Sequence, residues 1–216
     1  SLTINVSATP SLDKFDEFVG VDIEDVKAEG MIKNSVIFNE GFGNNDAGKG
    51  ISSSASEETN LSILKIALKK REEIKDRFFK KKRDINPLLL IQLPREKKSD
   101  PISLKVKDEV INWLETEFSI SLENGKLAIY LSEEKELLTN IEKLDNEVEV
   151  MLFKEGIALG WDCPRAHILL AFREMKSLRF STQTVGRIMR MAEPIKGHYD
   201  DDLLDNGYFY TNLDTV

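Results

Sequence analysis

The segments V-E-V-M-L-F at residues 148–153 and A-H-I-L-L-A-F at residues 166–172 decide the fold that this chain can adopt. The first shows the alternation of a strand and the second is an apolar run of strand length, and a helix candidate at residues 181–190 follows the second. Strands that alternate with helices predict a mostly parallel sheet, because parallel strands need a long crossover between them. Ligands of such sheets bind beyond the carboxyl ends of the strands, where the segments after Phe153 and Phe172 begin.

The same alternation extends over most of the chain. Further strands are predicted at residues 36–38, 88–92, 127–131 and 208–210, and further helices at residues 57–83, 106–118 and 134–144. Asn86 and Pro87 must end the first of these helices, and the Gly- and Ser-rich residues 41–56 before it predict a flexible loop. The fold class predicted from this pattern is α/β, with helices on both faces of a mostly parallel sheet.

Composition narrows the class of protein. The 216 residues carry a net charge of −8 and are 41% hydrophobic, which is typical of a soluble globular chain. No apolar run is long enough to cross a bilayer and no signal peptide is recognisable, so we expect no membrane partner and a cytoplasmic location. Cys163 is the only cysteine, which excludes an internal disulfide, and one cysteine with two histidines gives no basis for a zinc site.

Basic residues are concentrated in the predicted helix at residues 57–83. Between Lys65 and Arg83 there are ten Lys or Arg residues and three acidic ones. The simpler interpretation is a solvated helix face. The alternative is a strip that contacts the phosphates of duplex DNA. The acidic net charge argues against a dominant nucleic-acid surface and leaves such a local one open.

Q-T-V-G-R-I-M-R at residues 183–190 is the strongest candidate for chemistry. On a helix, Arg187 and Arg190 would lie on one face, three residues apart. A planar guanidinium matches phosphate oxygens, so two of them beside Gln183 suit a polyphosphate whose charge changes during transfer. Gly186 would allow close approach of the backbone to phosphate or to a neighbouring strand. The alternative is a surface helix whose arginines form salt bridges.

G-W-D-C-P-R-A at residues 160–166 and F-R-E at residues 172–174 accompany that segment. Together with residues 183–190 they resemble motifs V and VI of superfamily 2 helicases, in the form found in the Res subunit of type III restriction enzymes. The strong resemblance covers roughly residues 150–213. S-A-T-P at residues 7–10 is similar to motif III of the same superfamily, although an ordinary strand end closed by proline also explains it.

The resemblance implies a RecA-like three-layer sandwich and a domain plan. Residues 1–12 would end a first RecA-like domain, residues 13–86 would form an insertion or linker with the loop at 41–56 and the helix at 57–83, and residues 87–216 would form the second RecA-like domain. In the family, the P-loop and the metal-binding D-E-x-H motif lie upstream of motif III. We therefore expect this chain to be a fragment, with ATP and Mg²⁺ held mainly by the missing first domain.

The resemblance also implies roles for individual residues. Arg187 and Arg190 would reach the γ-phosphate across the domain cleft as arginine fingers, and Gln183 would orient the nucleotide or the attacking water. The residues implied on the nucleotide side are Gly160, Asp162 and Gly186, and those implied in DNA contact or coupling are Ser7, Thr9, Gly156 and Gln92.

Three neighbouring positions have more than one interpretation. Asp162 would accept hydrogen bonds from a ribose hydroxyl or from a motif VI arginine, or it would cap a helix. Trp161 is interpreted as core packing rather than base stacking. Cys163, next to Pro164, is interpreted as a small buried hydrophobe and not as a nucleophile.

The function that the resemblance implies is the second motor domain of an ATP-dependent DNA helicase or translocase. Its partners would be double-stranded DNA, the upstream RecA-like domain of the same protein and a Mod methyltransferase subunit, with a nuclease domain further downstream. One alternative is a non-catalytic nucleic-acid- or protein-binding module with a helicase fold. Another is a self-contained P-loop at residues 43–50 that uses Lys49, against which Gly50 argues because a P-loop has Ser or Thr there.

Overall fold

The computed structural model describes residues 19–41, 57–94, 101–131, 134–154, 162–172 and 184–211. Its elements in chain order are α1 (Ile23–Ala28), β1 (Ser35–Phe38), α2 (Glu57–Lys80), β2 (Leu88–Gln92), α3 (Pro101–Phe118), β3 (Leu127–Tyr130), β4 (Lys135–Glu136), β5 (Val150–Phe153), β6 (Ala166–Ala171) and β7 (Asn206–Thr211).

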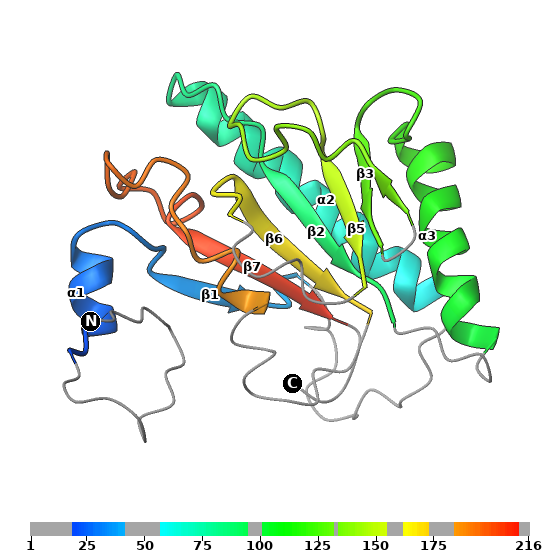
Figure 1. Cartoon of the computed structure of the whole chain (residues 1–216), viewed down its shortest axis with the longest axis horizontal. Coiled ribbons are helices and arrows are strands. Elements are labelled where there is room, and N and C mark those ends of the chain that lie inside the picture. The colour runs from blue at the N-terminus through cyan, green and yellow to red at the C-terminus, as the bar shows by residue number, and fades with distance from the viewer. Residues whose placement is uncertain are drawn as a thin grey trace, which may run out of the picture.

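The strands form one sheet in the order β1-β7-β6-β2-β5-β3-β4 (Figure 1). Every pairing is parallel except that of β3 with the short β4. The central strand β2 lies between β5 and β6, so Leu89 is in register with both Val150 and Ile168. The α/β fold with a mostly parallel sheet is therefore confirmed, and the arrangement is consistent with a RecA-like sandwich.

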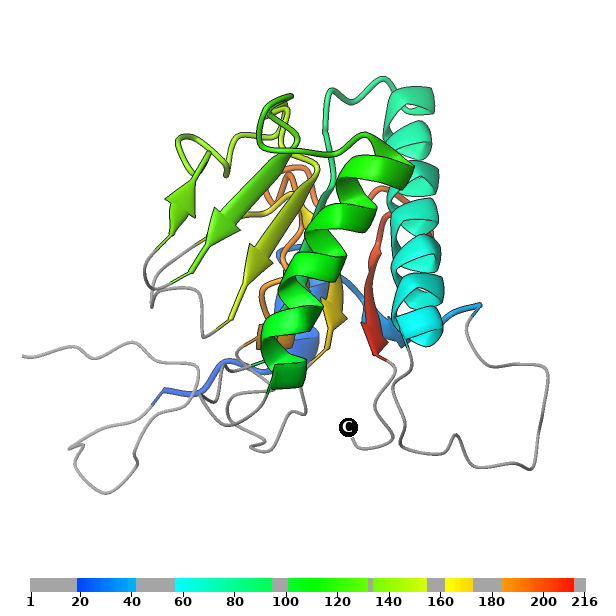
Figure 2. The same cartoon turned by 90° about the vertical axis from the view of Figure 1, so that its right-hand side faces the viewer.

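The two long helices α2 and α3 cover one face of the sheet, which we call the helical face (Figure 2). Side chains at alternate strand positions, such as Leu89 and Ile91, pack there against Leu64 of α2 and Trp113 of α3. Because both faces of the central strands are buried, the strands are continuous apolar runs rather than alternating ones.

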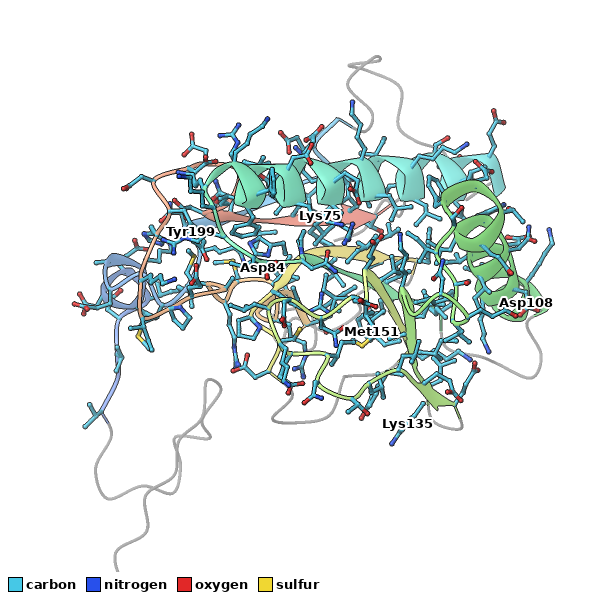
Figure 3. The ribbon with its side chains drawn as sticks, turned by 90° about the horizontal axis from the view of Figure 1, so that it is seen from above. Lys75, Asp84, Asp108, Lys135, Met151 and Tyr199 are labelled. Atoms are coloured by element: carbon cyan, nitrogen blue, oxygen red, sulfur yellow. The ribbon has the colours of Figure 1, made fainter. Side chains whose placement is uncertain are left out.

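The opposite face, which we call the turn face, is covered in the described residues by turns from residues 137–148, 162–165 and 184–191. Leu90, Met151 and Leu169 point to this face, and Figure 3 shows Met151 on the side of the sheet away from α2. The described residues of the segments at 160–166 and 183–190, such as Cys163 and Ile188, therefore pack on the turn face.

α2 begins at Glu57 and ends at Lys80, three residues before the predicted end. Lys82 then adopts the left-handed conformation with φ 57°. The Arg83 N–H donates to the Phe78 carbonyl and the Lys82 N–H donates to the Phe79 carbonyl, both at 2.9 Å. These two bonds are the Schellman arrangement, which ends a helix by satisfying its last carbonyls. No helix in the described ranges is long and apolar enough to cross a membrane.

The helix predicted at residues 134–144 is wrong. Residues 135–136 form β4, and turns follow, with Leu137 and Asn140 at positive φ (55° and 56°). Ile141 is nevertheless buried on the turn face. The apolar spacing that resembles a helix therefore comes from turns that bring single side chains down onto the sheet.

β1 belongs to the same sheet as the later strands, and α2 packs on one face of that sheet. β1 pairs with β7, and Ile63 and Ile74 of α2 are buried in the core of the helical face. The short helix α1, capped by the Asp22 side chain on the Glu24 N–H at 2.8 Å, was not predicted because six residues carry too little periodicity. The division of the chain at residue 86 stays a prediction, although the sheet itself continues across it.

Arg165 is a fully buried arginine whose contacts fix the turn before β6. Its Nε donates to the Ile141 carbonyl at 2.7 Å, and its Nη1 donates to the carbonyls of Asn86 and Val148 at 2.8 Å each. Burial lowers the pKa of Arg165 to about 10. These carbonyls compensate for the desolvation of the guanidinium charge. The contacts of Arg165 therefore fix the turn that carries Asp162.

Replacement of Lys82 by glycine should stabilise the chain. Lysine pays a steric penalty at positive φ that glycine does not, so Lys82→Gly is expected to raise the free energy of unfolding by about 1 kcal/mol. Lys80→Gly, two residues earlier inside the helix, is the matched control and should lower it by about 1 kcal/mol. Urea unfolding measures both, and a destabilised Lys82→Gly variant would contradict the assigned helix end.

Candidate functional site

Asp162 and Arg190 form an ion pair between the Asp162 Oδ1 and the Arg190 Nη1. The two side chains are 53% and 47% exposed, so the pair faces solvent. Of the acceptor roles predicted for Asp162, the structure shows the one toward an arginine of the second motif-like segment. The helix-cap alternative is wrong, because a turn and then β6 follow Asp162.

Arg187 lies beside this pair and is partly buried. Burial lowers its pKa, and the nearby charge of Arg190 lowers it further, whereas Asp162 and Tyr130 raise it. Among the described residues, both guanidiniums lie near the Asp162 carboxylate. Two guanidiniums in a partly desolvated place suit an anion with several oxygens.

The backbone that carries the arginines is a turn rather than the helix predicted for residues 181–190. Only Thr184 and Val185 of the described part are helical, and the N–H groups of Arg187 and Ile188 donate to carbonyls three residues earlier, at 3.3 and 3.0 Å. Arg190 then forms an antiparallel bridge with Ile32. The two arginines are therefore brought together by the turn and not by a helix face.

The turn is seated on β7 through a glycine that the sequence did not single out. A Cβ added to Gly207 would lie 3.1 Å from the Ile188 carbonyl oxygen and 3.4 Å from its side chain. The Ile188 side chain is fully buried on the turn face. Close backbone approach was predicted at Gly186, which is exposed here. That role for Gly186 stays a prediction.

Lys33 is the residue of this region that sequence reasoning missed. It is fully buried, and its Nζ donates to the carbonyls of Ile188 (2.8 Å), Arg190 and, at 3.5 Å, Ala166. Burial lowers its pKa to about 7, while Asp205 and then Cys163 oppose the shift. Lys33 belongs to no recognisable motif, and it lies just before a short strand in a segment without hydrophobic periodicity. No signal in the sequence could therefore have found it.

Cys163 and His167 flank the turn before β6 and are both buried. Burial raises the pKa of the Cys163 thiol to about 11, and its Sγ donates to the Ile141 carbonyl at 3.5 Å. Burial and the charge of Lys33 keep the pKa of His167 well below its ordinary value. A protonated thiol without an available base is no nucleophile, in agreement with the interpretation of Cys163 as a buried hydrophobe.

Gln92 is the last residue of β2 and alternates with Leu88 and Leu90, which places it on the turn face. Its side chain is fully buried, and neither amide atom has a hydrogen-bond partner among the residues that the structure describes. An unpaired buried amide is costly and is most often found where function, water or a ligand requires it. Its predicted role near DNA or nucleotide is not tested by this placement.

The arginine group does not lie at the predicted edge of the sheet. Asp162 precedes β6 by four residues, and the backbone of Arg190 pairs with Ile32, which precedes β1. Both attachment points are therefore on the amino side of their strands. A connection between parallel strands must return from the carboxyl end of one strand to the amino end of the next, and these residues lie on that amino side.

The other predicted site residues lie outside the described residues: Ser7, Thr9, Gly156, Gly160 and Gln183. The glycine-rich segment at 43–50 and Trp161 also lie outside them. Within the described ranges, no group of three or more His, Cys, Asp or Glu residues is arranged to hold a metal ion.

Most basic side chains of the segment from Lys65 to Arg83 face acidic partners. This favours the solvated-face interpretation over a strip free to bind phosphates. The pairs, at 2.7–3.8 Å, are Lys65–Glu117, Lys70–Glu40, Arg71–Glu149, Lys75–Glu149, Arg77–Asp201, Lys81–Asp201 and Arg83–Glu193.

Comparison with known proteins does not assign the chain: no family model matches it, and no curated protein does. The functional argument therefore stands on the residues and their geometry.

Replacement of Gln92 separates a functional from a structural role. Because both of its amide atoms are buried and unpaired, Gln92→Leu should leave the free energy of unfolding unchanged or raise it by about 1 kcal/mol. Asn86→Leu is the matched control, since the Asn86 amide is paired with Arg71 and with the Asn146 carbonyl at 2.8 Å. It should lose about 2 kcal/mol or more. Urea unfolding gives both values, and a loss in Gln92→Leu equal to that of the control would contradict the assigned environment.

Proposed function

We propose that this chain is the second motor domain of an ATP-dependent DNA helicase or translocase of the type III restriction Res type. The observation that carries the proposal is the Asp162–Arg190 ion pair with Arg187 beside it. It joins the two segments whose sequence resembles helicase motifs V and VI. The resemblance implies that the acidic residue of the first segment accepts from an arginine of the second, and this ion pair supports the proposal.

In the proposed reaction, Arg190 exchanges Asp162 for a phosphate oxygen of ATP bound between two RecA-like domains. The free energies of the two interactions of Arg190, with Asp162 and with phosphate, permit this exchange. An ion pair with both partners about half exposed is worth about 0–1 kcal/mol. A guanidinium that meets a polyphosphate in a closed interface makes stronger, charge-assisted bonds. Asp162 would therefore hold Arg190 in position without competing with the nucleotide.

Arg187 and Arg190 would stabilise the charge that develops on the transferred phosphoryl group. Arg187 is already partly desolvated, so little further loss of hydration accompanies closure of the interface. Most contacts to the nucleotide, and the Mg²⁺ that compensates its charge, would come from the upstream domain. Duplex DNA and a Mod methyltransferase subunit are partners that rest on the sequence resemblance alone.

The second candidate is a non-catalytic nucleic-acid- or protein-binding module with the same fold. The observation that favours it is that Arg190 already has an acidic partner at the surface, as a purely structural salt bridge would have. The paired basic residues of α2 argue against nucleic acid as the ligand of such a module.

Arg190→Ala is expected to separate the two functions. In a protein that carries the upstream P-loop domain, DNA-stimulated ATP hydrolysis should fall by about 10³-fold or more if Arg190 is an arginine finger. Arg83→Ala, which removes only the surface pair with Glu193 at 3.5 Å, is the control and should hydrolyse ATP normally. An unchanged rate in Arg190→Ala would favour the binding module.

The 216-residue chain by itself should hydrolyse ATP poorly. Robust turnover of this chain, abolished by Lys49→Ala, would instead make the glycine-rich segment at 43–50 a phosphate site.

A further inference from the structure

The buried ammonium of Lys33 contacts the turn at residues 184–191, which carries Arg187 and Arg190 and which we call the arginine turn. Lys33 has no exposed surface, and its Nζ donates to the carbonyls of Ile188 and Arg190, with Ala166 at 3.5 Å as a third acceptor. Two of these carbonyls belong to the turn that carries Arg187 and Arg190, and the third belongs to the first residue of β6. One side chain therefore ties the turn to the sheet.

The backbone next to Lys33 reinforces the same contact. The Lys33 N–H donates to the Met189 carbonyl at 2.6 Å, and the Met191 N–H donates to the Met31 carbonyl at 3.2 Å. These bonds hold the backbone of the turn against residues 31–33, but they leave the carbonyls of Ile188 and Arg190 facing inward. In a site that excludes water, those carbonyls need a donor, which the Lys33 ammonium supplies.

Each alternative to an ammonium at this position disturbs the turn. An apolar side chain would leave the inward carbonyls buried without this donor, which is unfavourable. The turn could then satisfy them only by rotating its peptide groups toward solvent, which would redirect Arg190 away from Asp162. A buried charge is itself unfavourable unless several groups solvate it, so the ammonium and the turn stabilise each other only in this arrangement.

We propose that Lys33 is a positioning residue for the arginine site: its ammonium fixes the turn at residues 188–190 and thereby the direction of Arg187 and Arg190. The effect on the turn is a property of the chain alone. Its consequence for catalysis rests on the proposed function.

The electrostatics around Lys33 make its charge sensitive to pH. Its pKa of about 7 means that the folded protein loses this charge as pH rises through neutrality. Since the unfolded chain keeps the proton up to a pKa near 10.5, this group makes the folded state relatively more stable as pH rises from about 7 to about 10. Over the same pH range the neutral Lys33 amine donates one hydrogen bond fewer than the ammonium. The turn should therefore become less ordered, although the free energy of unfolding of the whole chain does not fall.

Other titratable groups face this place from neighbouring elements. Asp205 accepts from the N–H groups of Tyr199 (2.8 Å) and Asp201 (2.9 Å). Cys163 has a pKa raised to about 11, and that of His167 is lowered well below 6.5. His198, whose Nε2 contacts the Ile32 carbonyl at 2.9 Å, lies beside the same segment and needs its own control.

The test follows the Arg190 Nε–H group by NMR in the 216-residue chain. Asp162→Asn first shows where this signal lies when the ion pair is absent. In Lys33→Met the signal should move to that position, with faster exchange of the Met191 amide. Lys27→Met removes a surface lysine paired with Glu24 at 2.8 Å, and is the matched control that should leave the signal in place. A folded Lys33→Met variant with an unmoved Arg190 signal would overturn the proposal.

A pH titration of the unmodified chain tests the same idea without any folding risk. The Arg190 signal should shift with a midpoint near pH 7, both in the unmodified chain and in His198→Gln. A signal that does not move between pH 6 and 8, or that moves only while His198 is present, would overturn the proposal.

Hydrolysis measurements separate this inference from the proposed function. With the upstream domain present, Lys33→Met should lower kcat by up to about 100-fold and leave KM for ATP nearly unchanged, as expected for a displaced catalytic group. If Arg190→Ala leaves hydrolysis unchanged, the proposed function fails and the NMR results still decide the role of Lys33. If Arg190→Ala is inactive but Lys33→Met has normal kcat and an unmoved signal, only the role of Lys33 fails.

Discussion

Parallel pairing of the strands is the constraint on which the rest of the structure depends. A parallel pair cannot be closed by a tight turn, so each connection must cross a face of the sheet before the next strand begins. In this chain the crossings also bury both faces of β2, β5 and β6, whose residues are fully enclosed. The connections on the turn face carry Asp162, Arg187 and Arg190, so the same constraint that builds the core assembles the candidate site.

Charge on the turn face is arranged in two layers. The buried layer contains Lys33 and Arg165, each solvated by backbone carbonyls rather than by carboxylates. The exposed layer contains Asp162 and Arg190, with Arg187 between the two environments. Buried cations that bind carbonyls rigidify the backbone, because each donor loses several kcal/mol of hydration that only correctly placed acceptors return. The surface pair above them stays weak and exchangeable. This combination suits a group that must be held in one place and yet change partners.

At a few positions the residue does not fit the usual preference for its backbone conformation or its environment, and the causes differ from one position to the next. Lys82 at positive φ lies at the end of α2. Gln92, with its unpaired buried amide, ends the central strand on the same face as the arginine turn. Gly207 permits the close approach of that turn to β7. Sequences that fold well agree with local preferences almost everywhere, so Gln92 and Gly207, which lie on the face that carries the candidate site, are more informative than Lys82.

The sequence by itself determined the α/β class, the positions of the long strands and α2, and the arginine spacing, because apolar runs and residue identity are local properties. It also indicated that Asp162 and an arginine of residues 187–190 belong together, through the resemblance of both segments to helicase motifs. It did not determine the turns at 137–148, whose apolar spacing resembles a helix until the sheet beneath them is known. Lys33 and Gly207 were decided only by the tertiary structure. Lys33 is recognised as a buried donor only through the Ile188 carbonyl, which lies more than a hundred residues away along the chain. Gly207 is recognised as a point of close contact only through the same carbonyl, about twenty residues away.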